Sequence, residues 1–274
     1  MLFDGIRGFV IEIVRYRELL KSLAAKEFKV RYKNAVLGFL WTILNPLLLM
    51  VVLTVVFHFF LKPRLSYTEQ YPFPGFLLCG LIPWTFMAHS LSQCTSSLVD
   101  NAGLIQKVYF PREIIPLSSI LANFMNFLLS LVVLFFFLIA LEQMPSIWLV
   151  AVPLIIFAEL LFVVGICLAA SSLHVFYRDV FYVVQVALLV WWWATPIFYP
   201  RQLVQEADAV SPLMYRLYMA NPMAAVVVSL RQIFLERRFP DVSLLVTLFA
   251  VAIASFIIGI VIFRRRQGVI ADFV

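Results

Sequence analysis

Long apolar runs recur along the chain, and shorter polar stretches separate them. Six of these runs reach about 20 residues or more, the length that a helix needs to cross about 30 Å of hydrocarbon. The pattern therefore predicts an all-α membrane protein with six transmembrane helices. The predicted spans are 38–61, 73–98, 116–141, 147–170, 180–199 and 242–263.

The segment 1–37 precedes the spans and has a different pattern. It is rich in basic residues, and apolar positions such as Ile6, Phe9 and Ile13 recur near the 3.6-residue period of a helix. We predict a cytoplasmic amphipathic helix on the membrane surface, followed by a six-span domain over 38–274. A cleaved signal peptide is not expected, because the first long apolar run begins only near Leu37.

The connection between the fifth and sixth spans is unusually long and apolar. Its stretch from Met223 to Leu235 is too short to cross a bilayer and too apolar for an open loop. We predict re-entrant or interfacial half-helices on the outer face. The alternative is an external amphipathic loop that packs on the bundle and has no gating role.

The composition agrees with a membrane protein, since 64% of the residues are hydrophobic and 13% are charged, against about 25% charged residues in soluble domains. The net charge is +6. With the N-terminus inside, the cytoplasmic segments hold 14 of the 21 basic residues. Because basic residues collect on the cytoplasmic side, both termini are expected there. The basic residues form short groups rather than one stripe, so no nucleic-acid partner is expected.

The sequence shows no catalytic or metal-binding motif. Gly75 to Gly80 matches the start of a phosphate-binding loop, but Leu81 stands where the lysine is needed. Three cysteines lie far apart beside apolar residues, so we interpret them as small buried hydrophobes. We therefore expect a chain without enzymatic activity, without a metal and without a cofactor of its own.

Six groups of short strings occur in order from residue 31 to the C-terminus. They are Arg31-Tyr32-Lys33 with Gly38-Phe39-Leu40-Trp41 and Asn45-Pro46, Val108 to Glu113, Phe176 to Val180, Thr195 to Pro200, Asn221-Pro222-Met223, and Ala271 to Val274. With these strings, the whole chain resembles the membrane subunit of ABC transporters that export lipid-linked polysaccharides such as O-antigen, capsule-like polymers and teichoic acids.

The resemblance implies a homodimer joined to two copies of a cytosolic ATPase, which would hold the ATP and magnesium. It also implies a place in the inner (cytoplasmic) membrane, and a polysaccharide linked to polyprenyl diphosphate as cargo. Two alternatives stay open. One is a permease of the same superfamily for a drug or simple lipid, and the other is a membrane-embedded glycosyl- or acyltransferase.

In the family, the cytoplasmic connection between the second and third spans is the coupling element that contacts the ATPase. Here it carries an aromatic pair flanked by charges, and a second cytoplasmic turn follows the fourth span. The expected contact residues are Lys107, Tyr109, Phe110, Pro111, Arg112, Glu113, Arg178 and Asp179. The alternatives are a plain membrane-proximal turn at the first connection and a helix-capping pair at the second.

Aromatic side chains are the expected lining of a glycan path, because their faces match the apolar faces of sugar rings. Three successive tryptophans point about 100° apart on a helix, so they cannot all face one way. The candidate path residues are Phe57, Phe60, Tyr182, Trp191, Trp192, Trp193 and Tyr199. An aromatic belt at the membrane interface is the alternative.

Further positions complete the candidate site. Prolines near the end of the fifth span would break its helix and form a hinge to the outer gate. The hinge candidates are Pro196, Pro200, Asn221 and Pro222. Arg31 and Lys33 are expected to attract the diphosphate headgroup, although any lipid phosphate would suit them. Glu159 is the one acid deep in a span, and we expect either a hydrogen bond to a group such as His89 or Gln185 or a protonated carboxyl at the dimer seam.

Overall fold

The computed structural model describes residues 2–33, 37–60, 71–207 and 211–273, and all regular structure in these ranges is helical. The helices are α1 (Leu2–Arg15), α2 (Arg17–Tyr32), α3 (Trp41–Thr54), α4 (Phe73–Asp100), α5 (Ala102–Lys107), α6 (Ile114–Ala140), α7 (Val152–Phe176), α8 (Val180–Trp193), α9 (Arg201–Gln205), α10 (Pro212–Met219), α11 (Pro222–Phe234), α12 (Val242–Arg266) and α13 (Ile270–Phe273). A 3₁₀ turn (Gly38–Leu40) and a π-helical turn (Val55–Phe60) flank α3, and a 3₁₀ turn (Ile147–Ala151) leads into α7.

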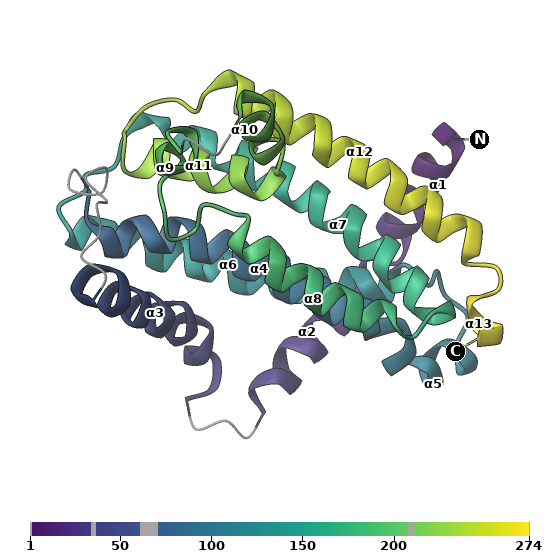
Figure 1. The fold of residues 1–274 in the computed structure, drawn as a ribbon. Helices are drawn as coiled ribbons and strands as arrows, with labels where there is room; N and C mark the ends of the chain where they lie inside the picture. The colour runs from purple at the N-terminus through teal and green to yellow at the C-terminus, as the bar shows by residue number, and fades with distance from the viewer. Residues whose placement is uncertain (1, 34–36, 61–70, 208–210, 274) are drawn as a thin grey trace.

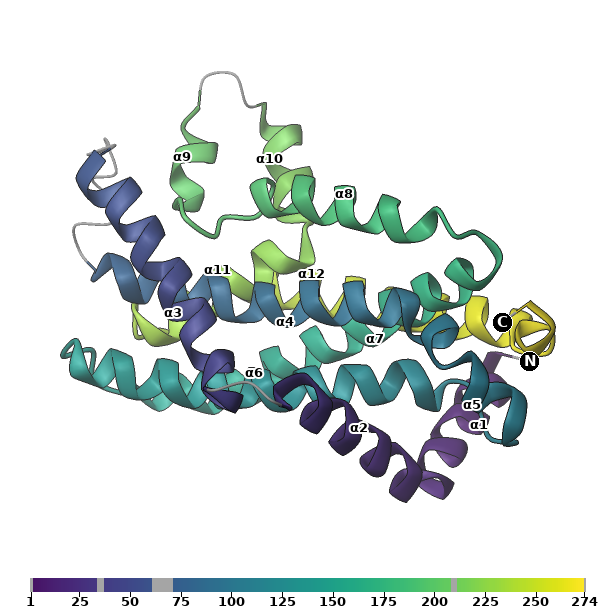
Figure 2. The same ribbon diagram turned by 90° about the horizontal axis from the view of Figure 1, so that it is seen from below.

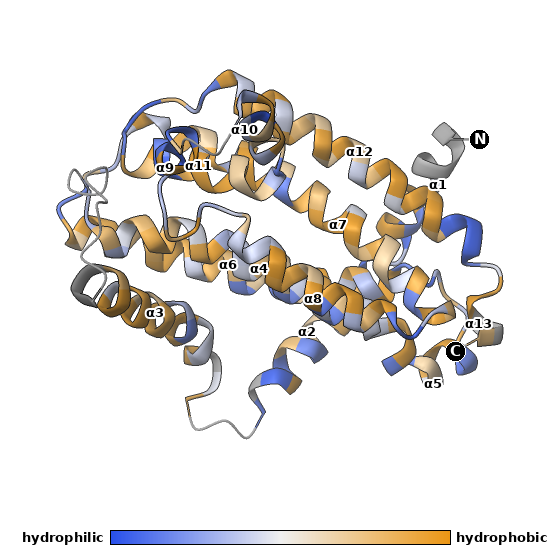
Figure 3. Ribbon diagram, viewed as in Figure 1, coloured by the Kyte–Doolittle hydropathy of each residue, from blue (hydrophilic) through white to orange (hydrophobic). Residues whose placement is uncertain are grey.

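Four helices in the described part are long and apolar enough to cross a membrane: α4, α6, α7 with its leading turn, and α12. They match the second, third, fourth and sixth predicted spans. The helices at the first and fifth spans, Trp41–Phe57 and Val180–Trp193, are apolar but shorter. The hydropathy colouring in Figure 3 shows apolar residues along the long helices and more polar residues near their ends.

The fifth predicted span extends beyond its helix, because α8 ends at Trp193 rather than at residue 199. The cause is local. Pro196 has no backbone N–H to donate, and a proline disfavours helical geometry at the residue before it. The chain then passes through α9 and α10, and α10 and α11 meet at a bend of 81°.

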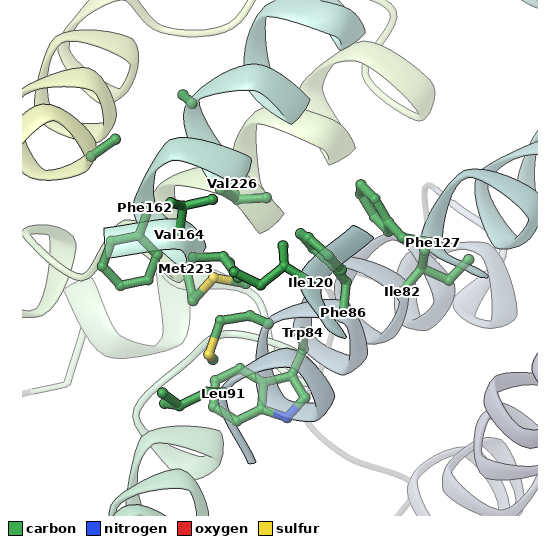
Figure 4. Close-up of a cluster of buried hydrophobic side chains, with 14 of the residues drawn as sticks. Ile82, Trp84, Phe86, Leu91, Ile120, Phe127, Phe162, Val164, Met223 and Val226 are labelled. Carbon is green, nitrogen blue, oxygen red and sulfur yellow. The ribbon is translucent and has the colours of Figure 1, made fainter. Parts of the chain in front are cut away.

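Helix α4 forms the centre of the bundle, and α6, α7, α8 and α11 all pack on it. Figure 4 shows Trp84 and Phe86 of α4 among side chains from three other helices, including Phe127 of α6, Phe162 of α7 and Met223 of α11. Close packing over one continuous core fixes the relative positions of these helices.

Helices α7 and α12 cross in direct backbone contact. A Cβ atom placed on Gly165 would overlap the backbone of Ser255, and one on Gly259 would overlap the carbonyl of Gly165. The hydroxyl of Ser255 also donates to the carbonyl oxygen of Phe162 at 3.1 Å. Small residues at such crossings let helices in a bilayer approach closely.

The N-terminal segment forms two helices, α1 and α2, where the sequence predicts one amphipathic helix. Phe9 of α1 is buried and packs edge-on against Phe256 of α12 at 5.9 Å between ring centroids. Helix α2 packs on α6. Both chain ends lie at the end of the bundle that carries α5, and α9, α10 and α11 lie at the opposite end (Figures 1 and 2).

Candidate functional site

The tryptophans at the end of α8 face in different directions, as helix geometry predicts. Trp191 and Trp192 are half-buried, and each meets the ring of Trp84 on α4 edge-on, at 6.1 and 5.6 Å between centroids. Trp193 is 59% exposed and contacts the ring of Phe198 at 5.1 Å. The first two rings therefore belong to the bundle, and Trp193 faces outward.

The other aromatic path candidates divide in a similar way. Tyr182 is 69% exposed on α8, eleven residues before Trp193. Phe57 stacks on Phe198 at 5.1 Å, so it links the end of α3 to the segment after α8. The hydroxyl of Tyr199 donates to the carbonyl of Trp193 at 2.9 Å. The side chain of Phe60 lies outside the described part of the structure.

Asn221 joins the end of α8 to the start of α11. Its side-chain oxygen accepts hydrogen bonds from the indole of Trp191 (2.8 Å) and from the backbone of Met223 (3.0 Å), so it caps α11. Its side-chain nitrogen donates to the carbonyl of Ala194 and the hydroxyl of Thr195, both at 3.1 Å. The side chain of the hinge candidate Asn221 therefore bonds directly to the residues that follow the end of α8.

Of the three prolines of the predicted hinge, two stand at the start of a helix and one follows the end of α8. Pro196 is buried in the segment after α8, Pro200 directly precedes α9, and Pro222 is the first residue of α11. A proline at the first helical position loses no hydrogen bond, because the N–H there has no helical partner. The prolines therefore mark where each short outer helix begins or cannot continue.

Arg231 is a functional candidate that the sequence interpretation missed. It lies fully inside the bundle on α11, where its guanidinium donates to the carbonyls of Phe76 (3.2 Å), Pro196 (2.6 Å) and Ile197 (2.6 Å). It also lies over the Phe76 ring, 3.4 Å from the centroid. The carbonyls freed where α8 breaks thus gain a charged donor. The sequence alone could have indicated Arg231, because an arginine inside the apolar stretch from Met223 to Leu235 needs polar partners.

The predicted coupling connection presents one aromatic ring and buries the other. Tyr109 is 96% exposed, whereas Phe110 is buried. Lys107 ends α5 and is exposed, and Pro111 and Arg112 are half-buried in the turn before α6. This connection borders a cleft of about 870 Å³ that α1 and the turn after α12 also line.

Glu113, the last residue of the connection, is buried and holds the connection to two other helices. Arg264 at the end of α12 contacts the carboxylates of both Glu113, at 3.3 Å, and Glu12 of α1. Burial raises the pKa of Glu113 above its usual range, and the neighbouring Glu12 raises it further. Sequence reasoning missed this cluster, because its three residues lie far apart along the chain.

Arg178 and Asp179 lie in the exposed turn between α7 and α8. Asp179 directly precedes α8, but its side chain makes no capping hydrogen bond to the helix. The capping alternative is therefore not observed. The turn lies at the same end of the bundle as α5, so both predicted coupling segments share one face (Figure 1).

The two predicted headgroup residues are not equivalent. Arg31 turns into the bundle, where its two terminal nitrogens donate to the side-chain oxygens of Asn123 (2.8 Å) and Gln93 (2.6 Å). Lys33 is exposed at the end of α2. The structure thus brings Arg31 together with α4 and α6 and leaves Lys33 at the surface.

Glu159 on α7 is fully buried, and neither of its carboxyl oxygens has a hydrogen-bond partner among the described residues. The expected bond to Gln185 is not made, because Gln185 donates to Ser92 at 2.8 Å instead. No bond to His89 is found in the described ranges either. An ionised carboxylate without partners at such a position is costly.

Comparison with known proteins gives consistent similarities. The profile of a family described as "ABC-2 type transporter" matches residues 18–235. An O-antigen export system permease protein, RfbA, of Myxococcus xanthus is 34% identical over 263 residues, which cover 96% of this chain and 98% of that protein. A protein of the same name from Klebsiella pneumoniae is 32% identical over 221 residues, or 80% of this chain and 81% of that one. The polysialic acid transport protein KpsM of Escherichia coli is 27% identical over 116 residues, 42% of this chain and 41% of that protein.

Proposed function

Because this chain belongs to the ABC-2 type transporter membrane family, we propose that it is the permease half of an ATP-driven exporter for a polysaccharide linked to polyprenyl diphosphate. The chain is a multi-pass membrane protein and a transport subunit rather than an enzyme. The observation that carries the proposed cargo is the similarity over almost the whole chain to a permease named for O-antigen export.

The proposed assembly is a homodimer of six-span subunits in the inner membrane, joined to two copies of a cytosolic ATPase. In this topology, α3 with its flanking turns and α8 are the first and fifth crossings, and α9 to α11 form a re-entrant gate. The burial of α11 and its 81° bend from α10 support the gate. Of the 21 basic residues, 14 lie in the segments that this topology assigns to the inside, which supports a cytoplasmic location for both chain termini.

The exposed aromatic face of α8 is the proposed wall of the glycan path. Tyr182 and Trp193 present their rings away from the bundle, and no fixed charge lies on α8 itself. Aromatic faces bind sugar rings by their apolar side without the strong, directional contacts of ion pairs. A long polymer can therefore slide along such a surface.

The ATPase is proposed to contact the end of the bundle that carries α5. Tyr109 projects from this end beside the cleft that the coupling connection borders. ATP and magnesium would bind to the partner, and hydrolysis would move this end of the permease. Exposed aromatic rings are frequent anchors in protein interfaces.

Co-purification tests the proposal. The chain, expressed with the ATPase encoded beside its gene, should form a stable complex whose ATP hydrolysis changes when a lipid-linked glycan is added. Deletion of the chain should remove the surface polysaccharide and cause the lipid-linked polymer to accumulate inside the cell. A chain that purifies without an ATPase, or a deletion strain with normal surface polysaccharide and no accumulation, would contradict the proposal.

A further inference from the structure

A cavity of about 310 Å³ with both polar and apolar walls lies between α2, α3, α4 and α6. Amide side chains line it from three of these helices, namely Asn45 on α3, Gln93 on α4, and Asn123 and Asn126 on α6. Ligand pockets in proteins span about 300–1,000 Å³, so this volume suits a small head group and not a length of polysaccharide.

The depth of the cavity is unusual for so many polar groups. Gln93 lies seven residues before the end of α4, which places it roughly 10 Å from the end of the bundle that carries α5. Both α4 and α6 are candidate membrane spans. Polar and charged groups at such a depth are costly, and they commonly mark a site for a polar ligand.

Arg31 supplies the positive charge of the cavity. Asn123 and Gln93 accept its two hydrogen bonds among the described residues, and Asn123 donates to Gln93 at 3.0 Å, so the amides also fix one another. Glu27, on the same helix, accepts instead from the hydroxyls of Ser118 (3.1 Å) and Ser119 (2.9 Å). Neutral amides therefore hold the guanidinium in position, and Glu27, which accepts from the two serines, also interacts with its charge.

Comparison with Arg231 shows why this arrangement favours a ligand. A guanidinium has five N–H groups. Arg231 is enclosed by three backbone carbonyls and an aromatic ring, which leaves no room for a ligand. Arg31 donates to two amide oxygens and borders an open cavity. The planar fork of a guanidinium matches the oxygens of a phosphoryl group.

We propose that this cavity binds a phosphoryl head group, with Arg31 as its cation and with Gln93 and Asn123 as the residues that orient Arg31. The inference rests on the proposed function, because a polymer linked to polyprenyl diphosphate brings this chemistry to the membrane. Free phosphate and ordinary phospholipids carry the same chemistry. The apolar wall formed by Trp41, Phe86 and Phe127 suits the first carbons of a lipid tail.

Calorimetric titration of the purified full-length chain in detergent micelles tests the site. The probes are farnesyl diphosphate, inorganic diphosphate and micelles that contain phosphatidylglycerol. We expect Arg31→Gln to weaken binding of the strongest probe at least tenfold and Arg31→Lys to restore part of it. Lys29→Gln is the matched control, because it removes an exposed positive charge on the same helix, two residues away, and should leave the affinity unchanged.

The three probes separate the possible sources of the phosphoryl group. Tighter binding of farnesyl diphosphate than of inorganic diphosphate indicates a polyprenyl lipid, equal binding of the two indicates the free anion, and displacement by phosphatidylglycerol indicates a bilayer lipid. Each of these results supports a phosphoryl site if it depends on Arg31. Equal affinities in wild type and Arg31→Gln, or equal losses in Arg31→Gln and Lys29→Gln, would overturn the proposal.

A second variant covers the case in which Arg31→Gln does not fold. Asn45→Phe places a ring in the cavity and leaves Arg31 with both amide partners, so it should abolish binding while thermal unfolding in micelles stays as in wild type. Normal binding by folded Asn45→Phe would exclude the cavity as the site. Binding is measured without the ATPase. A failure to bind the probes would therefore leave the export proposal intact, and a failure of export would leave the binding result intact.

Discussion

At the residue scale, three adjacent tryptophans on α8 have different surroundings. The indole of Trp191 donates to Asn221, and both Trp191 and Trp192 pack on Trp84, whereas Trp193 has most of its surface exposed. The 100° step between helical residues made such a division predictable from the sequence. Which ring faces inward depended on the position of α4, and the sequence pattern does not contain that information.

Alanine substitutions should separate the roles of these rings. Trp193→Ala removes an exposed ring, so we expect normal expression and thermal stability with impaired export of polysaccharide. Trp191→Ala removes a half-buried packed ring and one partner of Asn221, so we expect lower stability, by less than the ~3–5 kcal/mol that a fully buried aromatic side chain contributes. Export by whole cells and thermal unfolding in detergent measure the two effects. Equal losses of expression in both variants would favour the alternative of a membrane-interface belt.

Arg231 should be essential for the fold of the outer end. Arg231→Met keeps an unbranched side chain but leaves three buried carbonyls without their donor, and each such group costs about 1–3 kcal/mol. We therefore expect severe loss of folded protein, measured by size-exclusion chromatography and thermal unfolding. Arg216→Met on α10 is the control, because Arg216 is exposed and its replacement should be nearly neutral. Wild-type stability of Arg231→Met would show that the carbonyls find other partners.

At the element scale, the sequence predicts helices best where packing and hydropathy agree. The apolar runs at α4, α6, α7 and α12 are long enough to specify helices by themselves. The fifth run is predicted too long, because apolar character continues to Tyr199 while Pro196 ends the helix earlier. The N-terminal prediction misses the break at Tyr16 between α1 and α2. Hydropathy alone does not report where backbone geometry changes.

The crossing of α7 and α12 gives a prediction for a pair of elements. Gly259→Val places a branched side chain against the carbonyl of Gly165, so the two helices must separate and lose contacts along their length. We expect a marked decrease in thermal stability and in the yield of folded protein. Gly103→Ala on α5 is the matched control, because a Cβ there meets open space and alanine favours a helix by about 0.5–1 kcal/mol over glycine. Equal stabilities of the two variants would contradict the close crossing.

At the scale of the whole molecule, the end that carries α5 gathers segments from all parts of the chain. Arg264 joins α12 to Glu12 of α1 and to Glu113 before α6. Movement of the coupling connection would therefore be transmitted to the N-terminal helix and to the last long helix. Sequence reasoning named both Tyr109 and Phe110 as contact candidates, because aromatic and charged residues adjoin there, but it did not distinguish the exposed ring from the buried one. The ion-pair cluster required the fold, since only tertiary structure brings Glu12 and Arg264 together.

Tyr109 and Phe110 should respond differently to removal of their rings. Tyr109 is almost fully exposed, so Tyr109→Ala leaves the packing of this subunit unchanged but takes away the ring that is proposed to contact the ATPase. We expect a normal fold with weaker ATPase binding, by tenfold or more if Tyr109 is a central anchor of the interface. Phe110→Ala empties a buried position and should lower stability first. Pull-down of the ATPase and thermal unfolding, measured on the same preparations, compare the two variants. Full ATPase binding and full transport by Tyr109→Ala would exclude this residue from the coupling contact and direct attention to Arg178 and Asp179 on the same face.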